Sequence, residues 1–472
     1  MALARPLWAA ALLLLLAGLA QGEVVIEQAA RKIDISSSTA REQERLVLRN
    51  DGAEAKASVV LCERSSLLDQ AALLEVAPEG GSAKLPWTPA AALSGSPADV
   101  SCREYKLPAP LAAGGKTTLL SVAVYTHVLR PEPAEVSQRD VQRVVFRGGA
   151  RLMSPYKVES QATEIHLGRV SEAPTFTNVQ PVKRSTDTLT YGPYTDTPPF
   201  TSEPITVHYE NNQPFAHVTD LEREVEVSHW GNVYFEERYS LRHAGAKVVG
   251  EWSRYDIMTR PQEFARASIP ALAAVLPAGA RSLYYRDAIG NISSSETRHE
   301  AERVTVNLQP RYPLFGGWST KFLFGWSLPL SKAVAKDSRT GRMVLTTQVA
   351  PSILDLVVDE LTLKVVLPEG ASNPVATTEL PLSAGPTLET KHTYLDVMGR
   401  PVVVLRARNL VSDMTTPVKV EYTYSSLGLL QKPLLLVGAF GLLFVAAIVL
   451  NRGGASLVAS PSAQAVVKAH AS

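Results

Sequence analysis

The sequence predicts a mainly β protein, with two tandem antiparallel, sandwich-like β-rich domains followed by one C-terminal transmembrane helix. Three observations support this fold class. Short segments in which apolar and polar residues alternate recur along the chain between turn residues, as in antiparallel strands. The strand pattern starts again near residue 222. Residues 434–450 form an apolar stretch without a charge, which is typical of a membrane-spanning helix.

Residues 1–22 are predicted to be a secretory signal peptide. One positive residue, Arg5, precedes an apolar run from Leu7 to Leu19, and the small residues Ala20 and Gly22 offer cleavage sites. A signal of this kind directs the following chain into the endoplasmic reticulum. We therefore expect most of the protein to lie in the lumen.

The next two segments, residues 23–215 and 216–428, are predicted to be the lumenal β-rich domains. The clearest predicted strands of the first are residues 45–49, 57–61, 118–126, 143–146, 164–167 and 205–209. Those of the second are residues 224–228, 233–242, 361–367, 400–406 and 418–424. Residues 77–97 show no periodicity and are predicted to be a loop, and residues 261–274 are the best candidate for a short helix.

An internal repeat favours the division into two domains. The segment Arg31–Ser36 resembles Arg223–Ser228, and Ile205–Tyr209 resembles Val418–Tyr422. A third short match, between residues 48–52 and 241–245, lies in the same order. The repeat places the boundary near residues 213–220.

Residues 433–450 are predicted to span the membrane, with residues 451–472 as a short cytosolic tail. At about 1.5 Å per residue the helix reaches about 26 Å, close to the thickness of the endoplasmic-reticulum bilayer. The helix is apolar on all sides, whereas a core helix is usually amphipathic. Together with the signal peptide, it predicts a single-pass type I topology.

Two glycines of this helix, Gly438 and Gly441, predict helix packing. They share one broad face with Ala446, and small residues let helix backbones approach closely in lipid. The spacing is not the G-x-x-x-G motif, so we expect a neighbouring helix of another subunit as the partner. The alternative is a simple anchor whose glycines face lipid.

The composition and motifs argue against nucleic-acid binding and against catalysis. The formal net charge is only +1, so we expect no nucleic-acid partner. The segment Gly114–Thr117 resembles part of a phosphate loop, but Pro110 stands where the motif needs glycine. The nine histidines show no metal-ligand spacing, and no G-x-S-x-G motif is present. We therefore expect no catalytic residues, no bound cofactor and no metal.

Two covalent modifications are predicted. Cys62 and Cys102 are the only cysteines, and in an oxidising lumen we expect them to form a disulfide. Asn291 begins the sequon Asn291–Ser293, which predicts an N-linked glycan in a lumenal chain.

One aromatic-rich stretch, residues 307–330, has two interpretations. Aromatic and arginine side chains concentrate binding energy, so the stretch could be a docking surface. The other interpretation is a pair of strands that place large side chains in the core around Gly316 and Gly317, and we favour it.

Several longer segments resemble the ribophorin I family, the large single-pass subunit of the endoplasmic-reticulum oligosaccharyltransferase. The segments are residues 226–232, 253–256, 284–293, 311–318, 367–370 and 393–401 in the second predicted domain, and 145–146, 154–156, 191–194 and 207–212 in the first. The resemblance runs in order from about Gln138 to the membrane helix. Residues 23–137 match more loosely.

The resemblance implies a non-catalytic role in the complex that transfers a lipid-linked oligosaccharide to Asn of N-x-S/T in nascent proteins. A multi-spanning subunit carries the catalytic site in that family, and this subunit helps in complex assembly and substrate presentation. The implied partners are the other subunits, the nascent polypeptide, the translocon and the ribosome. Animal members carry a long cytosolic tail implicated in ribosome contact, whereas residues 451–472 are short, so contact through this tail is in doubt.

Two other classes of protein fit part of the pattern. A type I membrane receptor or adhesion protein has the same topology and β-rich domains. A membrane-tethered lumenal hydrolase is disfavoured, because no nucleophile or carboxylate constellation stands out in the sequence.

Overall fold

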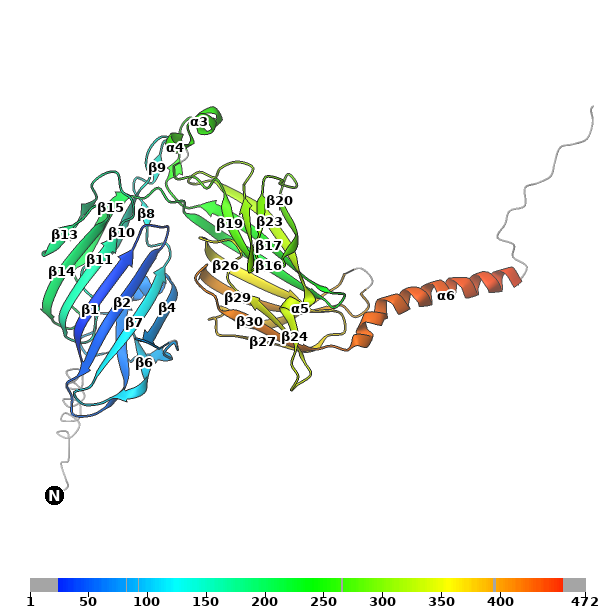
Figure 1. Ribbon diagram of the computed structural model, residues 1–472, viewed down its shortest axis with the longest axis horizontal. Coiled ribbons are helices and arrows are strands. Elements are labelled where there is room, and N and C mark those ends of the chain that lie inside the picture. The colour runs from blue at the N-terminus through cyan, green and yellow to red at the C-terminus, as the bar shows by residue number, and fades with distance from the viewer. Residues whose placement is uncertain (1–23, 82, 92, 265, 394–395, 453–472) are drawn as a thin grey trace, which may run out of the picture.

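The computed structural model describes residues 24–81, 83–91, 93–264, 266–393 and 396–452. Figure 1 shows two bodies made of β-sheets and a long C-terminal helix that leaves the second body on the side away from the first. We call the bodies the first β unit and the second β unit. The predicted signal peptide, and the predicted tail beyond Arg452, lie outside the described residues.

The first β unit contains one short helix, α2 (Ser65–Leu68), and strands β1 to β15. Its strands are β1 (Val24–Asp34), β2 (Ala40–Asn50), β3 (Lys56–Arg64), β4 (Ala71–Pro78), β5 (Trp87–Pro89), β6 (Val100–Leu111), β7 (Lys116–Tyr125), β8 (Arg130–Pro131), β9 (Glu135–Val136), β10 (Arg143–Gly149), β11 (Val158–His166), β12 (Thr175–Phe176), β13 (Val182–Arg184), β14 (Thr188–Thr197) and β15 (Pro204–Glu210).

The second β unit contains strands β16 to β30 and three short helices. Its elements are β16 (Ala216–Ser228), β17 (Asn232–His243), β18 (Lys247–Val248), α3 (Arg254–Thr259), α4 (Pro261–Phe264), β19 (Leu272–Pro277), β20 (Arg281–Asp287), β21 (Glu296–His299), β22 (Arg303–Leu308), β23 (Ser319–Pro329), α5 (Leu330–Ala333), β24 (Val334–Lys336), β25 (Met343–Gln348), β26 (Val357–Val366), β27 (Ser372–Thr378), β28 (Ala384–Lys391), β29 (Arg400–Val411) and β30 (Pro417–Thr423).

The two units have the same strand order in all three of their main sheets. The seven-stranded sheets run β13-β14-β11-β1-β2-β7-β4 and β28-β29-β26-β16-β17-β23-β20. The four-stranded sheets run β12-β15-β10-β8 and β27-β30-β25-β24, and the three-stranded sheets run β3-β6-β5 and β19-β22-β21. The internal repeat seen in the sequence therefore extends to the whole topology of each unit.

Strand pairing is mostly antiparallel, with one parallel pair in each large sheet. β1 pairs with β11, and β16 pairs with β26, in parallel. More than one hundred residues separate the two members of each pair. The pairing therefore agrees with the predicted antiparallel, sandwich-like fold class. The alternation within a strand indicates which face is buried but not the direction of the partner strand, so it could not predict the parallel pairs.

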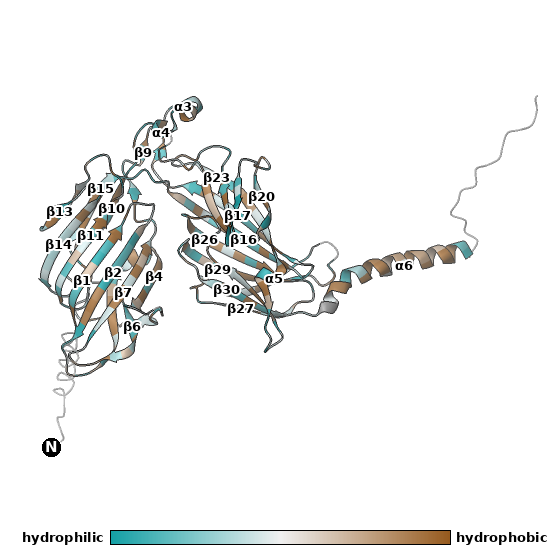
Figure 2. Ribbon diagram, viewed as in Figure 1, coloured by the Kyte–Doolittle hydropathy of each residue, from teal (hydrophilic) through white to brown (hydrophobic). Residues whose placement is uncertain are grey.

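The buried side chains gather between the sheets of each unit, as alternation predicts. Figure 2 shows hydrophobic and hydrophilic residues alternating along the strands, whereas the C-terminal helix is mostly hydrophobic. In the aromatic-rich stretch, Phe322, Phe324 and Trp326 on β23 are buried in the core of the second unit. The core interpretation therefore holds for β23.

Two smaller expectations were wrong. The predicted loop at residues 77–97 contains the end of β4 and all of β5. The predicted short helix at residues 261–274 ends at Phe264 as α4, and its last residues belong to β19. The alternation of Leu272, Ala274 and Leu276 toward the core decides the second case, because these side chains are buried with strand periodicity.

The C-terminal helix α6 (Gln431–Arg452) follows a short 3-10 helix, η2 (Ser426–Leu430). Among the described residues it is the one helix long and apolar enough to cross a membrane. Apolar and polar contacts join the second unit to the first: Val124, Ala72 and Leu73 of the first unit pack against the core of the second. Arg41 forms two hydrogen bonds with Asp413, at 2.9 and 3.0 Å, and β18 pairs with β9.

Candidate functional site

A buried ion pair lies between the seven-stranded and four-stranded sheets of the first β unit. Arg31 on β1 and Glu42 on β2 are both almost fully buried and form a salt bridge. Arg31 also donates a hydrogen bond of 2.9 Å from Nη1 to the carbonyl oxygen of Gly149 on β10. These contacts connect the seven-stranded sheet with the four-stranded sheet. They place charged groups in a part of the core where apolar side chains usually pack.

The second β unit repeats this arrangement. Arg31 faces Glu44 across the β1–β2 pair, and Arg223 faces Glu237 across the equivalent β16–β17 pair. Arg223 donates from Nη1 to the carbonyl oxygen of Gln348 on β25, at 2.8 Å. The buried arginine is thus part of the shared architecture, and its presence alone does not mark a functional site.

The two units differ at the positions beside the arginine. In the second unit, Phe235 and Trp326 face each other across β17 and β23 and stack with ring centroids 5.2 Å apart. Glu42 and Ala123 face each other at the equivalent positions on β2 and β7. Two large aromatic side chains are therefore replaced by a carboxylate and a methyl group, which leaves space in the first unit.

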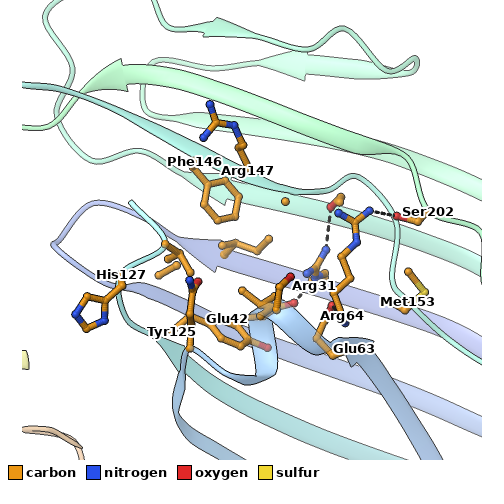
Figure 3. A pocket seen from close by; sticks show the side chains of 18 of the residues that line it. Arg31, Glu42, Glu63, Arg64, Tyr125, His127, Phe146, Arg147, Met153 and Ser202 are labelled. Carbon is orange, nitrogen blue, oxygen red and sulfur yellow. Dashed lines mark hydrogen bonds and ion pairs between the residues drawn. The ribbon is translucent and has the colours of Figure 1, made fainter. Parts of the chain in front are cut away.

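Glu42 borders two cavities, one of about 270 Å³ between the sheets and a smaller one of about 40 Å³ that Ala123 also lines. Figure 3 shows Arg31, Glu42 and Glu63 on one side of the larger cavity and Phe146 and Arg147 on the other. Its lining mixes charged with aromatic and other apolar groups. A cavity of this kind suits an extended polar chain better than a purely apolar ligand.

The electrostatics of the cavity are set by burial. Burial raises the pKa of Glu63 to about 7, against the opposing attraction of Arg31. Burial, helped by the charge of Glu42, raises the pKa of Glu44 well above its ordinary value. Burial disfavours the charged form of Arg31, but Glu42 outweighs it and the pKa of Arg31 lies above its ordinary value. The arginine therefore stays charged while the neighbouring carboxyl groups hold protons easily.

The groups in the cavity are arranged for binding. The Ser202 hydroxyl accepts a hydrogen bond of 2.5 Å from Arg64 Nη2. An arginine keeps its proton, so it cannot activate the hydroxyl as a nucleophile. Figure 3 shows His127, which also lines the cavity, at the end away from Ser202. A ligand in this cavity could form hydrogen bonds with its charged side chains and pack against its apolar ones.

These cavity residues do not stand out in the sequence as a functional site. A signal was present, because Arg31, Glu42 and Glu44 occupy inward positions in the alternating pattern of β1 and β2. The loss of the aromatic pair could be recognised only after the strands of the two units were aligned through their register.

The predicted cysteine pair lies on neighbouring strands of the first unit. Cys62 on β3 faces Cys102 on β6, and their sulfur atoms lie 2.00 Å apart at bonding distance. The pair belongs to the three-stranded sheet, and Cys62 also lines the smaller cavity.

The predicted glycosylation residue, Asn291, is exposed just after a turn of the second unit. Asp287 accepts hydrogen bonds from the backbone of Ile289 and Gly290, each at 2.9 Å, and binds Arg311 through both carboxylate oxygens. Arg311 thereby lowers the pKa of Asp287 to about 2. The turn presents Asn291 at the surface, far along the chain from both the cysteines and the cavity.

Gly438 and Gly441 lie in α6, and a side-chain carbon added to either would meet no atom within 4 Å. The helix contacts the body of the second unit near its start, where Lys432 Nζ lies 2.5 Å from Asp396 Oδ1. The structure thus brings together the cysteine pair alone among the predicted site residues, and it leaves the glycine face open.

The fold and the cavity define a class: a protein with one candidate membrane helix and two β units of common topology, the first with a polar cavity between its sheets. The chain belongs to the Ribophorin I family, which matches residues 24–451. The mainly β fold expected from the family resemblance is confirmed.

Related proteins are similar over most of the chain. Subunit 1A of the dolichyl-diphosphooligosaccharide–protein glycosyltransferase of Arabidopsis thaliana is 38% identical over 455 residues, covering 95% of this chain and 73% of that protein. Subunit 1B from Oryza sativa subsp. japonica is 39% identical over 434 residues, 91% of each chain. Subunit 1 from Caenorhabditis elegans is 37% identical over 368 residues, covering 78% of this chain and 62% of that one.

Proposed function

We propose that this protein is a non-catalytic subunit of the endoplasmic-reticulum oligosaccharyltransferase. The observation that carries the proposal is the family match over residues 24–451, with relatives named as subunit 1 of that glycosyltransferase. Both β units lie in the lumen, α6 crosses the membrane once, and the chain ends in the cytosol. Its partners are the other subunits, including the multi-spanning catalytic subunit, and the nascent polypeptide, and it lies near the translocon and the ribosome.

Purification of the tagged full chain from membranes in mild detergent tests this proposal. We expect the catalytic subunit to co-purify, and we expect the complex to glycosylate an acceptor peptide that contains N-x-S/T. Recovery of the chain without any oligosaccharyltransferase subunit would exclude the proposal.

The glycan on Asn291 separates this function from that of a receptor or adhesion protein. A resident of the endoplasmic reticulum keeps high-mannose glycans, whereas an exported protein carries processed ones. We expect a mass loss after digestion with an endoglycosidase specific for high-mannose glycans, and no glycan on the Asn291→Gln variant. A resistant, processed glycan would favour the receptor class.

We further propose that the cavity of the first unit holds a segment of the nascent polypeptide and presents it to the catalytic subunit. The cavity exists because Glu42 and Ala123 stand where the second unit has Phe235 and Trp326. Charged groups beside an apolar wall can bind the backbone and side chains of an extended chain without requiring one sequence.

Photo-crosslinking tests this role with a matched control inside the same chain. A photoreactive residue replaces Arg147, which lines the cavity on β10, or Thr346, which occupies the equivalent position on β25. We expect nascent chains that carry a sequon to crosslink at position 147 several times more than at position 346. The double variant Glu42→Phe and Ala123→Trp copies the filled second unit and should abolish the difference. Equal crosslinking at both positions would refute peptide binding in the cavity.

A further inference from the structure

Two histidines and an aspartate from both β units meet where the units touch. His127 follows β7 of the first unit, His217 lies on β16, and Asp359 lies on β26. One possible ligand atom from each of the three lies within 4.8 Å of the others. The Nε2 atom of His127 is 3.1 Å from Oδ1 of Asp359, and the two imidazole rings lie 4.8 Å apart at 72°.

The facing atoms lack ordinary partners. His217 is 8% exposed, and its Nε2 atom is buried without a hydrogen bond. Oδ1 of Asp359 is also buried, and it has the ion-pair contact with His127 but no hydrogen bond. A buried polar atom without a partner costs about 1–3 kcal/mol. Two such atoms on the paired strands β16 and β26, beside a third residue that can bind a metal ion, suggest a bound cation.

The hydrogen bonds on the Nδ1 side of His127 determine which ring nitrogen can bind a cation. Asn409 donates from Nδ2 to the carbonyl oxygen of Gln70, so its Oδ1 accepts the hydroxyl proton of Thr126 at 2.6 Å. The Thr126 oxygen can then accept a proton only from Nδ1 of His127, 3.0 Å away. When the ring is neutral, its proton therefore lies on Nδ1, and the lone pair of Nε2 faces Oδ1 of Asp359.

A lone pair and a carboxylate oxygen 3.1 Å apart repel each other unless a positive group lies between them. This orientation, in which the outer nitrogen of the ring is held by a hydrogen bond, is the one seen in metal-ligating histidines. Figure 3 shows the His127 ring at the edge of the polar cavity, turned away from Arg31 and Glu42.

We propose that His127, His217 and Asp359 bind one zinc ion that links the two β units. Two imidazole nitrogens and one carboxylate oxygen suit Zn²⁺, whereas Ca²⁺ and Mg²⁺ prefer oxygen ligands. With bonds of about 2.0–2.1 Å, the ligand atoms of a tetrahedral site lie about 3.4 Å apart. The 3.1 Å pair nearly matches this spacing, and a small rotation of the rings closes the longer separation. A water molecule completes the fourth position.

Nothing in the sequence indicates this site, because His127, His217 and Asp359 lie far apart along the chain. They meet only through the parallel β16–β26 pair and the contact between the units. The expectation of no metal rested on the absence of ligand spacing along the chain, and that criterion cannot detect ligands brought together by the fold.

Zinc titration of the metal-free full chain in detergent tests the proposal. Competition with a chromophoric chelator should give one zinc ion per chain with a Kd of micromolar or tighter, and Ca²⁺ at the same concentrations should not compete. Cobalt in place of zinc should give the visible absorption of a tetrahedral site. Absence of a stoichiometric zinc site in this range would overturn the proposal.

Variants distinguish this site from zinc on the protein surface. His127→Asn keeps a residue that tolerates the left-handed backbone at this position, where φ is 58°. Asp359→Asn keeps the shape of the side chain. We expect each to weaken zinc binding at least tenfold while the metal-free melting temperature changes little. The control His166→Ala removes a similar but exposed histidine, 3.7 Å from Asp187, and should bind as the parent does. Full zinc affinity in both site variants, or an equal loss in the control, would refute the assignment.

Discussion

At the residue scale, the equivalent buried arginines of the two units lie in different surroundings. Arg223 lies within 6 Å of the rings of Phe235 and Trp326, which pack around it. Arg31 lies among carboxyl groups that border a cavity. An Arg–Glu pair buried without further partners contributes little net stability, because desolvation offsets the attraction of the charges. Arg31 has a further partner in the carbonyl oxygen of Gly149, and the pair borders the polar cavity.

The pH dependence of stability should reveal Glu63. Its pKa of about 7 in the folded protein lies above the ordinary value of 4.5, so between these values the folded state binds more protons than the unfolded state. Stability should fall as the pH rises from about 5 to about 7. Because Glu63 is partly exposed, we expect the free energy of unfolding of the parent to fall by only about 1–2 kcal/mol over this range through this group. The Glu63→Gln variant should not show this fall.

Denaturant unfolding of the full chain at several pH values measures this effect. Glu104→Gln, which changes an exposed glutamate on the neighbouring strand β6, is the control and should leave the pH dependence of the parent intact. A Glu63→Gln variant whose stability still falls with the slope of the parent would show that another group is responsible.

The cysteine pair should resist alkylation in the non-reduced protein. A bond between Cys62 and Cys102 closes a loop with a sequence separation of 40, and we expect its loss in a Cys62→Ala, Cys102→Ala variant to cost about 2–4 kcal/mol of stability. Peptide mapping before and after reduction checks the pairing, and denaturant unfolding measures the cost. Detection of both thiols in the free form without reduction would contradict this.

At the scale of elements, the sequence was most informative where burial alternates. β17 alternates over its whole length and β16 alternates from Leu221 onward, and both overlap predicted strands. β23 is buried without interruption from Phe324 to Leu328 and lies in the favoured core stretch. Short strands such as β5, with all three residues exposed, carry no such pattern, so residues 77–97 read as loop. The cavity could not be predicted from alternation. It depends on Glu42 and Ala123, which lie on different strands and lack the bulk of Phe235 and Trp326 at the equivalent positions.

The glycine face of α6 should matter for assembly. Replacing Gly438 and Gly441 together by Leu adds bulk to an open face of the helix, while leucine favours insertion into the hydrocarbon. We expect normal insertion but at least a several-fold loss of co-purifying subunits. Ala447→Leu is the control, because at 100° per residue it lies on the side opposite Gly438. A glycine double variant that recovers the complex as well as the parent would show that α6 is only an anchor.

At the scale of the molecule, the repeated topology indicates two domains that meet through polar contacts and an apolar contact, in which Val124, Ala72 and Leu73 of the first unit pack against the core of the second. β15 ends at Glu210 and β16 begins at Ala216, so the connection is short. Contacts such as the Arg41–Asp413 pair are partly exposed and add little to the stability of either unit. Apart from the β9–β18 pair, the strand pairs among the described residues stay within one unit.

Each unit should therefore fold alone. We expect residues 24–215 and residues 216–428, expressed separately without α6, to unfold cooperatively and to show the circular dichroism of β proteins. Thermal and denaturant unfolding of each fragment measures this. If neither fragment folds but the two fold when expressed together, the units form one cooperative body and the division near residue 216 is wrong.

The connection between β30 and α6 has a mechanical consequence. Only Tyr424, Ser425 and the 3-10 helix η2 separate the last strand from the helix, and Lys432 is held by Asp396 at 2.5 Å. A linker this short leaves α6 little freedom to move relative to the second unit. Because Figure 1 places the second unit between α6 and the first, the second unit works as a spacer of constant length. A polypeptide bound by the first unit would therefore be held at a constant distance from α6. Lengthening the linker between β30 and α6 would change which sequons of that polypeptide reach the catalytic subunit.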